Sequence, residues 1–275
     1  MSLSTKDLTH RVVVITGAGS GIGQELALAC ARRGARLALC DVNTAGMERT
    51  AISARANGVQ VYTQTVDVTD ADRMTAFAKE VLERFGGVDL LVNNAGIGVV
   101  AGFLETTPTD WQRLIGINVM GVVHGNTAFL PSMIERGSGH VVNVSSAAGI
   151  LANPALSAYS ATKFAVFGLS EALRMELREH RIGVTAVCPG VINTAITTSS
   201  PIRGGNADAR QEKMAALYAK RGYTPDRVAL NILRAVDANK AVAPIAPEAH
   251  LMYGLSRAVP PLARWLSRQL AKLAV

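Results

Sequence analysis

Two kinds of apolar pattern alternate along the chain. Short runs of branched aliphatic residues are typical of strands buried on both faces of a parallel sheet. Longer stretches with an apolar residue every three or four positions are typical of helices. The expected strands are residues 11–15, 36–40, 59–63 (followed by 66–68), 88–92, 140–144, 183–188 and 241–245. The expected helices are one ending at residue 31, one ending at 56, and then 70–85, 108–135, 157–179, 210–220, 225–238 and 260–275.

Strands and helices alternate without a linker break, so the sequence predicts a single domain over residues 1–275. The fold class expected for such a pattern is α/β, with a doubly wound and mostly parallel sheet flanked by helices. Pro244 in the last strand predicts an edge or broken strand, because proline cannot donate a hydrogen bond to a neighbouring strand.

A glycine-rich turn, Thr16-Gly-Ala-Gly-Ser-Gly-Ile-Gly23, joins the first expected strand to the first expected helix. Its spacing is T-G-x-x-x-G-x-G, because Ile22 stands where G-x-G-x-x-G would place its last glycine. Strand, glycine turn and helix together present backbone N–H groups and a helix N-terminus to a pyrophosphate. An ordinary tight turn is the alternative, but the position after the first strand favours a Rossmann-like dinucleotide site.

An acidic residue, Asp41, ends the second expected strand, about 20 residues beyond the glycine turn. A carboxylate there can bind the adenosine ribose hydroxyls, and it would repel a 2′-phosphate. Its neighbours Val42 and Asn43 are not basic, and neither are Ala18 and Ser20 in the turn. The sequence therefore favours NAD(H) over NADP(H). The alternative is that Asp41 only caps the next helix.

Tyr159 and Lys163 lie four positions apart on the expected helix 157–179, so they share one helix face. A free tyrosine has a pKa near ~10, and a nearby ammonium lowers it towards the range useful for acid–base catalysis. The pair alone is also compatible with a half-buried ring beside a solvated amine. Ser145 and Ser146 follow the fifth strand, where a catalytic hydroxyl would belong. Asn118 is unfavourable inside helix 108–135, and we expect it to bond the backbone and bend the helix.

The segment 195–222 is polar, contains glycine and serine, and is the best candidate for a mobile lid. Apolar residues in it favour a lipophilic secondary alcohol or ketone, of steroid, fatty or polyketide type, as substrate: Ile196, Ile202, Met214, Leu217 and Tyr218. The alternative is that these residues belong to the core.

The C-terminal stretch 260–275 is a basic amphipathic helix in sequence. One stripe is apolar: Leu262, Trp265, Leu266, Leu270 and Leu273. Another is basic: Arg264, Arg268 and Lys272. Such a helix can lie on an anionic membrane, which would give peripheral membrane contact. It can also pack on the fold or on a neighbouring subunit, and both interpretations stay open.

Composition restricts the classes of partner. The net charge of +7 is spread along the chain without a dense basic run interleaved with aromatic residues, so nucleic-acid binding is not expected. Cys30, Cys40 and Cys188 are too few for a disulfide framework or a metal site, and we expect them to be reduced core residues of a cytoplasmic protein. Residues 1–11 are polar, unlike a signal peptide, and no uninterrupted apolar run reaches the ~20 residues that span a bilayer.

As a set, the motifs resemble the short-chain dehydrogenase/reductase family in its compact form. The resemblance covers residues 8–195, with weaker correspondence to residue 246. The motifs that carry it are the TGAGSGIG turn, Asp41, Asp67-Val68, the Asn93-Asn94-Ala95-Gly96 turn, Asn118, Ser146, Tyr159, Lys163 and Pro189-Gly190. The thirteen-residue spacing to Tyr159 that this family shows selects Ser146 over Ser145.

The resemblance implies transfer of a hydride between nicotinamide and a secondary alcohol or ketone. Tyr159 would be the general acid/base, assisted by Lys163, while Ser146 would orient the substrate oxygen and Asn118 would help to hold a water. The implied cofactor site comprises Gly17, Ser20, Gly21, Ile22, Gly23, Asp41, Asp67, Val68, Asn94, Ala95, Gly96, Tyr159, Lys163, Pro189, Gly190, Ile192 and Thr194. A homodimer or homotetramer paired through the helices carrying Asn118 and Tyr159 is implied too. A non-catalytic dinucleotide sensor and an isomerase or dehydratase on the same scaffold are the alternatives.

Overall fold

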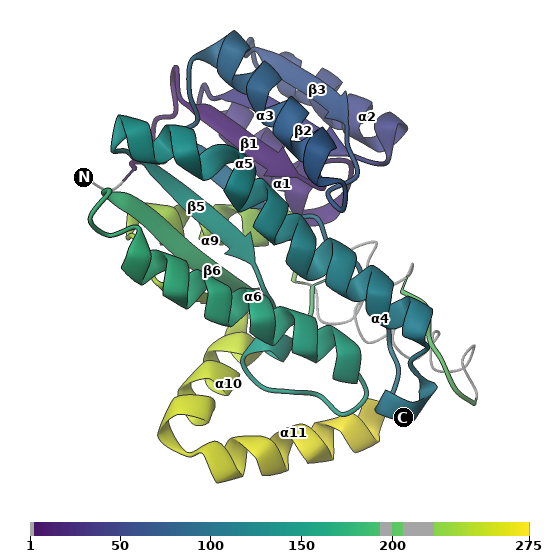
Figure 1. Ribbon diagram of the computed structural model, residues 1–275. Coiled ribbons are helices and arrows are strands. Elements are labelled where there is room, and N and C mark those ends of the chain that lie inside the picture. The colour runs from purple at the N-terminus through teal and green to yellow at the C-terminus, as the bar shows by residue number, and fades with distance from the viewer. Residues whose placement is uncertain (1–2, 193–199, 206–222, 275) are drawn as a thin grey trace.

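A seven-stranded parallel sheet lies at the centre of the molecule, in the order β3-β2-β1-β4-β5-β6-β7 (Figure 1). The structure is a computed structural model, and it describes residues 3–192, 200–205 and 223–274. The strands are β1 (Val12–Thr16), β2 (Arg36–Asp41), β3 (Val61–Thr65), β4 (Leu90–Asn93), β5 (Gly139–Val144), β6 (Ile182–Pro189) and β7 (Val242–Ile245). Every pair of neighbouring strands is parallel. The predicted Rossmann-like α/β fold is therefore confirmed.

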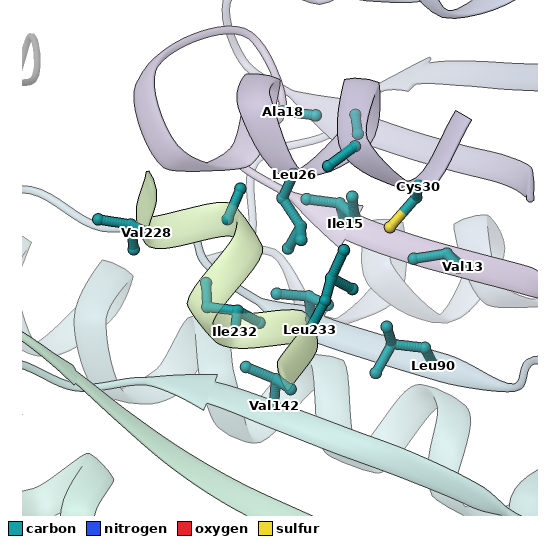
Figure 2. Close-up of a cluster of buried hydrophobic side chains, with 14 of the residues drawn as sticks. Val13, Ile15, Ala18, Leu26, Cys30, Leu90, Val142, Val228, Ile232 and Leu233 are labelled. Atoms are coloured by element: carbon teal, nitrogen blue, oxygen red, sulfur yellow. The ribbon is translucent and has the colours of Figure 1, made fainter. Parts of the chain in front are cut away.

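Helices cover both faces of this sheet, because alternate residues of each strand point to opposite sides. Val13 and Ile15 of β1 pack against α1 (Gly21–Ala31), α2 (Thr44–Arg55) and α9 (Pro225–Asp237) in the cluster that Figure 2 shows. Val12 and Val14 face the other layer, which contains α3 (Ala71–Phe85), α4 (Pro108–Ile115), α5 (Gly121–Arg136) and α6 (Ser157–Glu176). The strand order reverses beside β1, where the chain passes from β3 to β4, and this switch point is where open α/β sheets bind ligands.

The long helix expected over 108–135 is interrupted by one π-helical turn, Gly116–Met120, which joins α4 to α5. Asn118 lies in this turn and is fully buried. The expectation that Asn118 bonds the backbone is confirmed by its two hydrogen bonds to Ile97. By length and composition alone, the whole stretch Pro108–Arg136 could cross a membrane. However, Phe129 and Met133 pack in the core between α3 and the sheet.

The C-terminal part adds two helices, α10 (Pro247–Ala258) and α11 (Pro260–Ala274), which contact each other beyond the edge strand β7. The edge position predicted from Pro244 is confirmed, since β7 has β6 as its one neighbour. Helix α11 was expected and α10 was not. The strand bounds differ most from expectation in β3 and β4, and by one residue in other strands. Pairing of Leu37 with Val61 places β3 at Val61–Thr65 instead of 59–63, and β4 begins at Leu90 instead of residue 88.

Candidate active site

A cleft of about 500 Å³ opens at the carboxyl ends of the central strands. Most of the residues expected in the site line it: Gly17, Ser20, Gly21, Ile22, Asp41, Asp67, Val68, Asn94, Ala95, Gly96, Ser146, Tyr159, Lys163, Pro189, Gly190 and Ile192. Gly23 and Asn118 lie behind this lining, and Thr194 lies outside the described residues. Residues separated by up to 175 positions are thus gathered at one edge of the sheet, where parallel strands end together.

The glycine turn forms a cradle that only glycine backbones can make. Gly17 and Gly21 have φ values of +67° and +56°, which L-residues with side chains rarely adopt. A Cβ on Gly23 would lie 2.1 Å from the carbonyl oxygen of Gly17. Ser20 precedes α1 and makes no side-chain cap, so the N–H groups of the first helical turn are left to a ligand. This cradle fits the pyrophosphate of a dinucleotide.

The turn after β4 holds the glycine cradle in place. The backbone N–H groups of Asn94 and Ala95 both donate to the hydroxyl of Thr16, at 3.0 Å each. The side-chain amide of Asn94 donates to the carbonyl oxygens of Thr16 and Gly17, at 2.9 and 3.1 Å. Asn94 therefore supports the turn in addition to lining the cleft. Thr16 was missed by the sequence reasoning, although its place at the start of the glycine motif could have revealed it.

Asp41 lies at the ribose end of the cradle. One carboxylate oxygen accepts the N–H of Gly19 at 2.7 Å, and the other accepts the N–H of Asn43 at 2.8 Å. Each oxygen has a second lone pair that can accept a ribose hydroxyl. Asn43 is the residue that caps α2, through a 3.0 Å bond from the N–H of Gly46. The alternative that Asp41 only caps this helix is therefore wrong.

Lys163 belongs to α6, the helix that also carries Tyr159, and its side chain is almost fully buried. Its Nζ donates to the carbonyl oxygen of Val144 at 2.9 Å and lies 5.7 Å from the centre of the Tyr159 ring. Burial lowers the pKa of Lys163 to about 8. The structure thus places this amine beside the Tyr159 ring, and its electrostatic effect on the phenol stays a prediction.

Two serines follow β5, but they have different roles. Ser145 is buried, and its hydroxyl donates to the backbone carbonyl of Lys163 at 2.7 Å. Ser146 is partly exposed in the cleft, and its Oγ accepts the N–H of Ala148 at 3.1 Å, so its O–H points away from that bond and can donate to a substrate. The geometry thus supports the choice of Ser146 as the substrate-facing hydroxyl.

Asn118 connects the loop after β4 to the helix that carries Lys163. Its side chain accepts the N–H of Ile97 at 2.9 Å and donates to the hydroxyl of Thr162 at 3.1 Å. A Cβ on Gly96 would lie 3.2 Å from the Asn118 oxygen and 3.5 Å from Lys163 Nζ, so these groups converge there. The side chain therefore ties the loop after β4 to α6 next to Lys163, and a role in holding water stays a prediction.

The half of the cleft beyond Tyr159 is mainly apolar. Its lining includes Val99, Val100, Leu151, Leu156 and, from the unexpected helix α10, Met252. Ser267 of α11 also reaches it. No pattern in the sequence placed these two C-terminal residues here.

The described part of the expected lid is tied to the rim of this apolar half. Ile202 pairs with Val100, and Arg203 bonds the buried carboxylate of Asp110 at 2.9 and 3.2 Å. This guanidinium lowers the pKa of Asp110 to about 2. Four residues expected in the pocket lie outside the described residues: Ile196, Met214, Leu217 and Tyr218.

Comparison with known proteins identifies the architecture. The family model described as "short chain dehydrogenase" matches residues 11–203. The chain is 41% identical to the "Probable oxidoreductase EphD" of Mycobacterium tuberculosis over 263 residues, which is 94% of this chain and 44% of that protein. It therefore spans less than half the length of EphD. It is 39% identical to the "Putative oxidoreductase SadH" of the same species, covering 90% of each chain.

Similar solved structures belong to the same family as the sequence relatives. A short-chain dehydrogenase/reductase from Burkholderia phymatum in complex with NAD superposes with a TM-score of 0.85 at 31% identity, covering 94% of this chain and 96% of that one. Other similar structures hold NAD or an NADP derivative. The chain therefore shares its fold with structures that hold a dinucleotide.

Proposed function

Because this chain belongs to the short-chain dehydrogenase/reductase family, we propose that it uses NAD(H) to interconvert a lipophilic secondary alcohol and its ketone. The observation that carries the proposal is the lining of the cleft. The glycine cradle with Asp41, the acid–base candidates Tyr159 and Ser146, and an apolar wall that includes Val99, Leu151 and Met252 all line this one cleft. A sensor would need the cradle alone, so the acid–base groups favour an enzyme.

The residues in the middle of the cleft account for the proton chemistry. The bound dinucleotide supplies the hydride acceptor or donor at its nicotinamide. Tyr159 takes the alcohol proton during oxidation and returns it to the ketone oxygen during reduction. Ser146 donates a hydrogen bond to the same oxygen and fixes its orientation. The ammonium of Lys163, 5.7 Å from the centre of the Tyr159 ring, stabilises the phenolate that forms when Tyr159 gives up its proton.

The apolar wall is the reason for proposing a lipophilic substrate. We expect kcat/KM for a series of linear secondary alcohols to rise by roughly fourfold per added methylene until the wall is filled, since burial of one CH₂ is worth about 0.8 kcal/mol. For each alcohol of the series, kcat/KM is measured from the increase in absorbance as NAD⁺ is reduced to NADH. Preference for polyols over long-chain alcohols would contradict the proposal. Binding without any net reduction of NAD⁺ would favour the sensor or the isomerase.

Asp41 supports the choice of NAD(H). We expect the wild type to bind NADH at least about tenfold more tightly than NADPH, because the carboxylate repels a 2′-phosphate. Asp41→Ala should lower the ratio of NADH affinity to NADPH affinity. Asp67→Ala is the matched control, since it removes another carboxylate of the same cleft. The family resemblance implies that Asp67 holds the adenine ring, which NADH and NADPH share, so the ratio of the two affinities should stay unchanged. Fluorescence titration measures both ligands, and tighter binding of NADPH by the wild type would refute the assignment.

A further inference from the structure

Among the side chains of α11 that the structure describes, those of residues 260–269, one side packs on the fold. Ala263 and Ser267 are buried, and the Ser267 hydroxyl donates to the carbonyl oxygen of Ala152, in the loop that leads from β5 to α6 (Figure 1). Leu262 and Trp265 belong to the apolar stripe of this helix, and they remain 45% and 58% exposed. The fold therefore covers only part of that stripe.

The exposed side of α11 is also strongly basic. Arg264 and Arg268 are exposed and lie one helical turn apart, next to Trp265. The sequence contains no acidic residue from Val259 to Val275, so nothing within the segment neutralises these charges. Two copies of this face would bring like charges together, which disfavours self-association through it.

We propose that this face of α11, defined by Leu262, Arg264, Trp265 and Arg268, docks on an anionic membrane surface. Arginines attract anionic lipid headgroups, and an exposed tryptophan beside an exposed leucine is suited to the boundary between headgroups and acyl chains. Charge complementarity thus selects an anionic bilayer over a neutral one.

The opposite side of the same helix reaches the catalytic cleft. Ser267 lines the cleft together with Met252 of α10, and a helix with its side chains is about 10 Å across. Docking through the outer face would therefore bring the apolar half of the cleft close to the membrane, where a lipophilic alcohol or ketone resides. This consequence rests on the proposed function, whereas the docking itself does not.

Vesicle flotation tests the docking without any catalytic measurement. We expect the wild type to float with vesicles that contain phosphatidylglycerol and to stay at the bottom with phosphatidylcholine alone. The double substitution Arg264→Glu/Arg268→Glu should lower the partition coefficient by about tenfold or more, and Trp265→Ala should lower it by roughly fivefold. The matched control is Arg73→Glu/Arg178→Glu, which changes the net charge equally at exposed sites on other elements and should float like the wild type.

Three results would overturn the proposal. The wild type could fail to float, it could float equally with both kinds of vesicle, or the α11 double variant could float as well as the control. A change of sedimentation coefficient without lipid, caused by the α11 substitutions alone, would assign the face to a second copy of the chain instead. Melting temperature and NADH binding should match the wild type in every variant, and turnover of a water-soluble alcohol should be unchanged. Failure of the docking is thereby distinguished from failure of the proposed reaction.

Discussion

Replacing Tyr159 with phenylalanine is expected to lower kcat by about 10²- to 10⁴-fold while NADH affinity stays within about threefold of wild type. The change removes one oxygen and the proton it carries. The ring keeps its place, because it packs with Val99, Leu114 and Ala158 beneath the cleft. The cofactor cradle is formed by other elements, so binding of NADH is not expected to depend on the phenol oxygen.

Steady-state kinetics measures kcat of Tyr159→Phe, and a fluorescence titration measures its affinity for NADH separately. Tyr62→Phe is the matched control, since its hydroxyl lies on β3, away from the cleft lining, and bonds Gln64. That variant should keep full turnover. The assignment of Tyr159 as the acid/base fails if its kcat stays within about threefold of wild type, far from the loss that acid–base catalysis implies.

Replacing Gly23 with alanine is expected to weaken NADH binding by at least about 100-fold, which corresponds to roughly 2.7 kcal/mol. The new Cβ would meet the Gly17 carbonyl oxygen at 2.1 Å and the Asn94 side-chain nitrogen at 2.6 Å. The carbonyl is backbone, so α1 must move away from the turn. The shift would also disturb the bonds by which Asn94 holds Thr16 and Gly17. Overpacking of this kind costs about 1–3 kcal/mol of stability as well.

Gly168→Ala provides the control for this substitution. Gly168 lies inside α6, and an added Cβ would meet no atom within 4 Å. An alanine there should stabilise the helix by up to about 1 kcal/mol and leave NADH affinity unchanged. Circular dichroism melts show how much of each variant is folded, so that affinity is compared between folded proteins. If Gly23→Ala binds NADH with an affinity within about threefold of wild type, the assignment of the glycine turn as the cofactor cradle is wrong.

The order and type of the elements could be predicted from the sequence, because local pattern controls them. Branched apolar runs predicted all seven strands, and Pro244 predicted the edge position of the last. The glycine motif and the residues at the strand ends could also be assigned to one cleft. Parallel strands end at the same edge of a sheet, so a residue's place after a strand already gives its place in the fold.

The exact bounds of the elements and the roles of individual residues within the site could not be predicted in this way. The start of β3 depends on its register with β2, which is a contact between distant segments. The family spacing selected Ser146 over Ser145, but only the packing around Lys163 shows the physical reason, which is that the Ser145 hydroxyl is buried and bonded. Similarly, the bonds of Asn94 and Thr16 show that part of the NNAG turn supports the cradle.

The membrane location and the oligomeric state stay predictions, because neither is decided within one chain. By itself, the sequence determined the α/β fold, the dinucleotide-type turn and the Tyr159–Lys163 pair, since each depends on residues a few positions apart. Only the tertiary structure decided that Met252 of α10 and Ser267 of α11 line the cleft. It also decided that α11 buries Ala263 and Ser267 while Trp265 stays exposed. A helical stripe shows which residues share a face, but what that face meets depends on where the rest of the chain has folded.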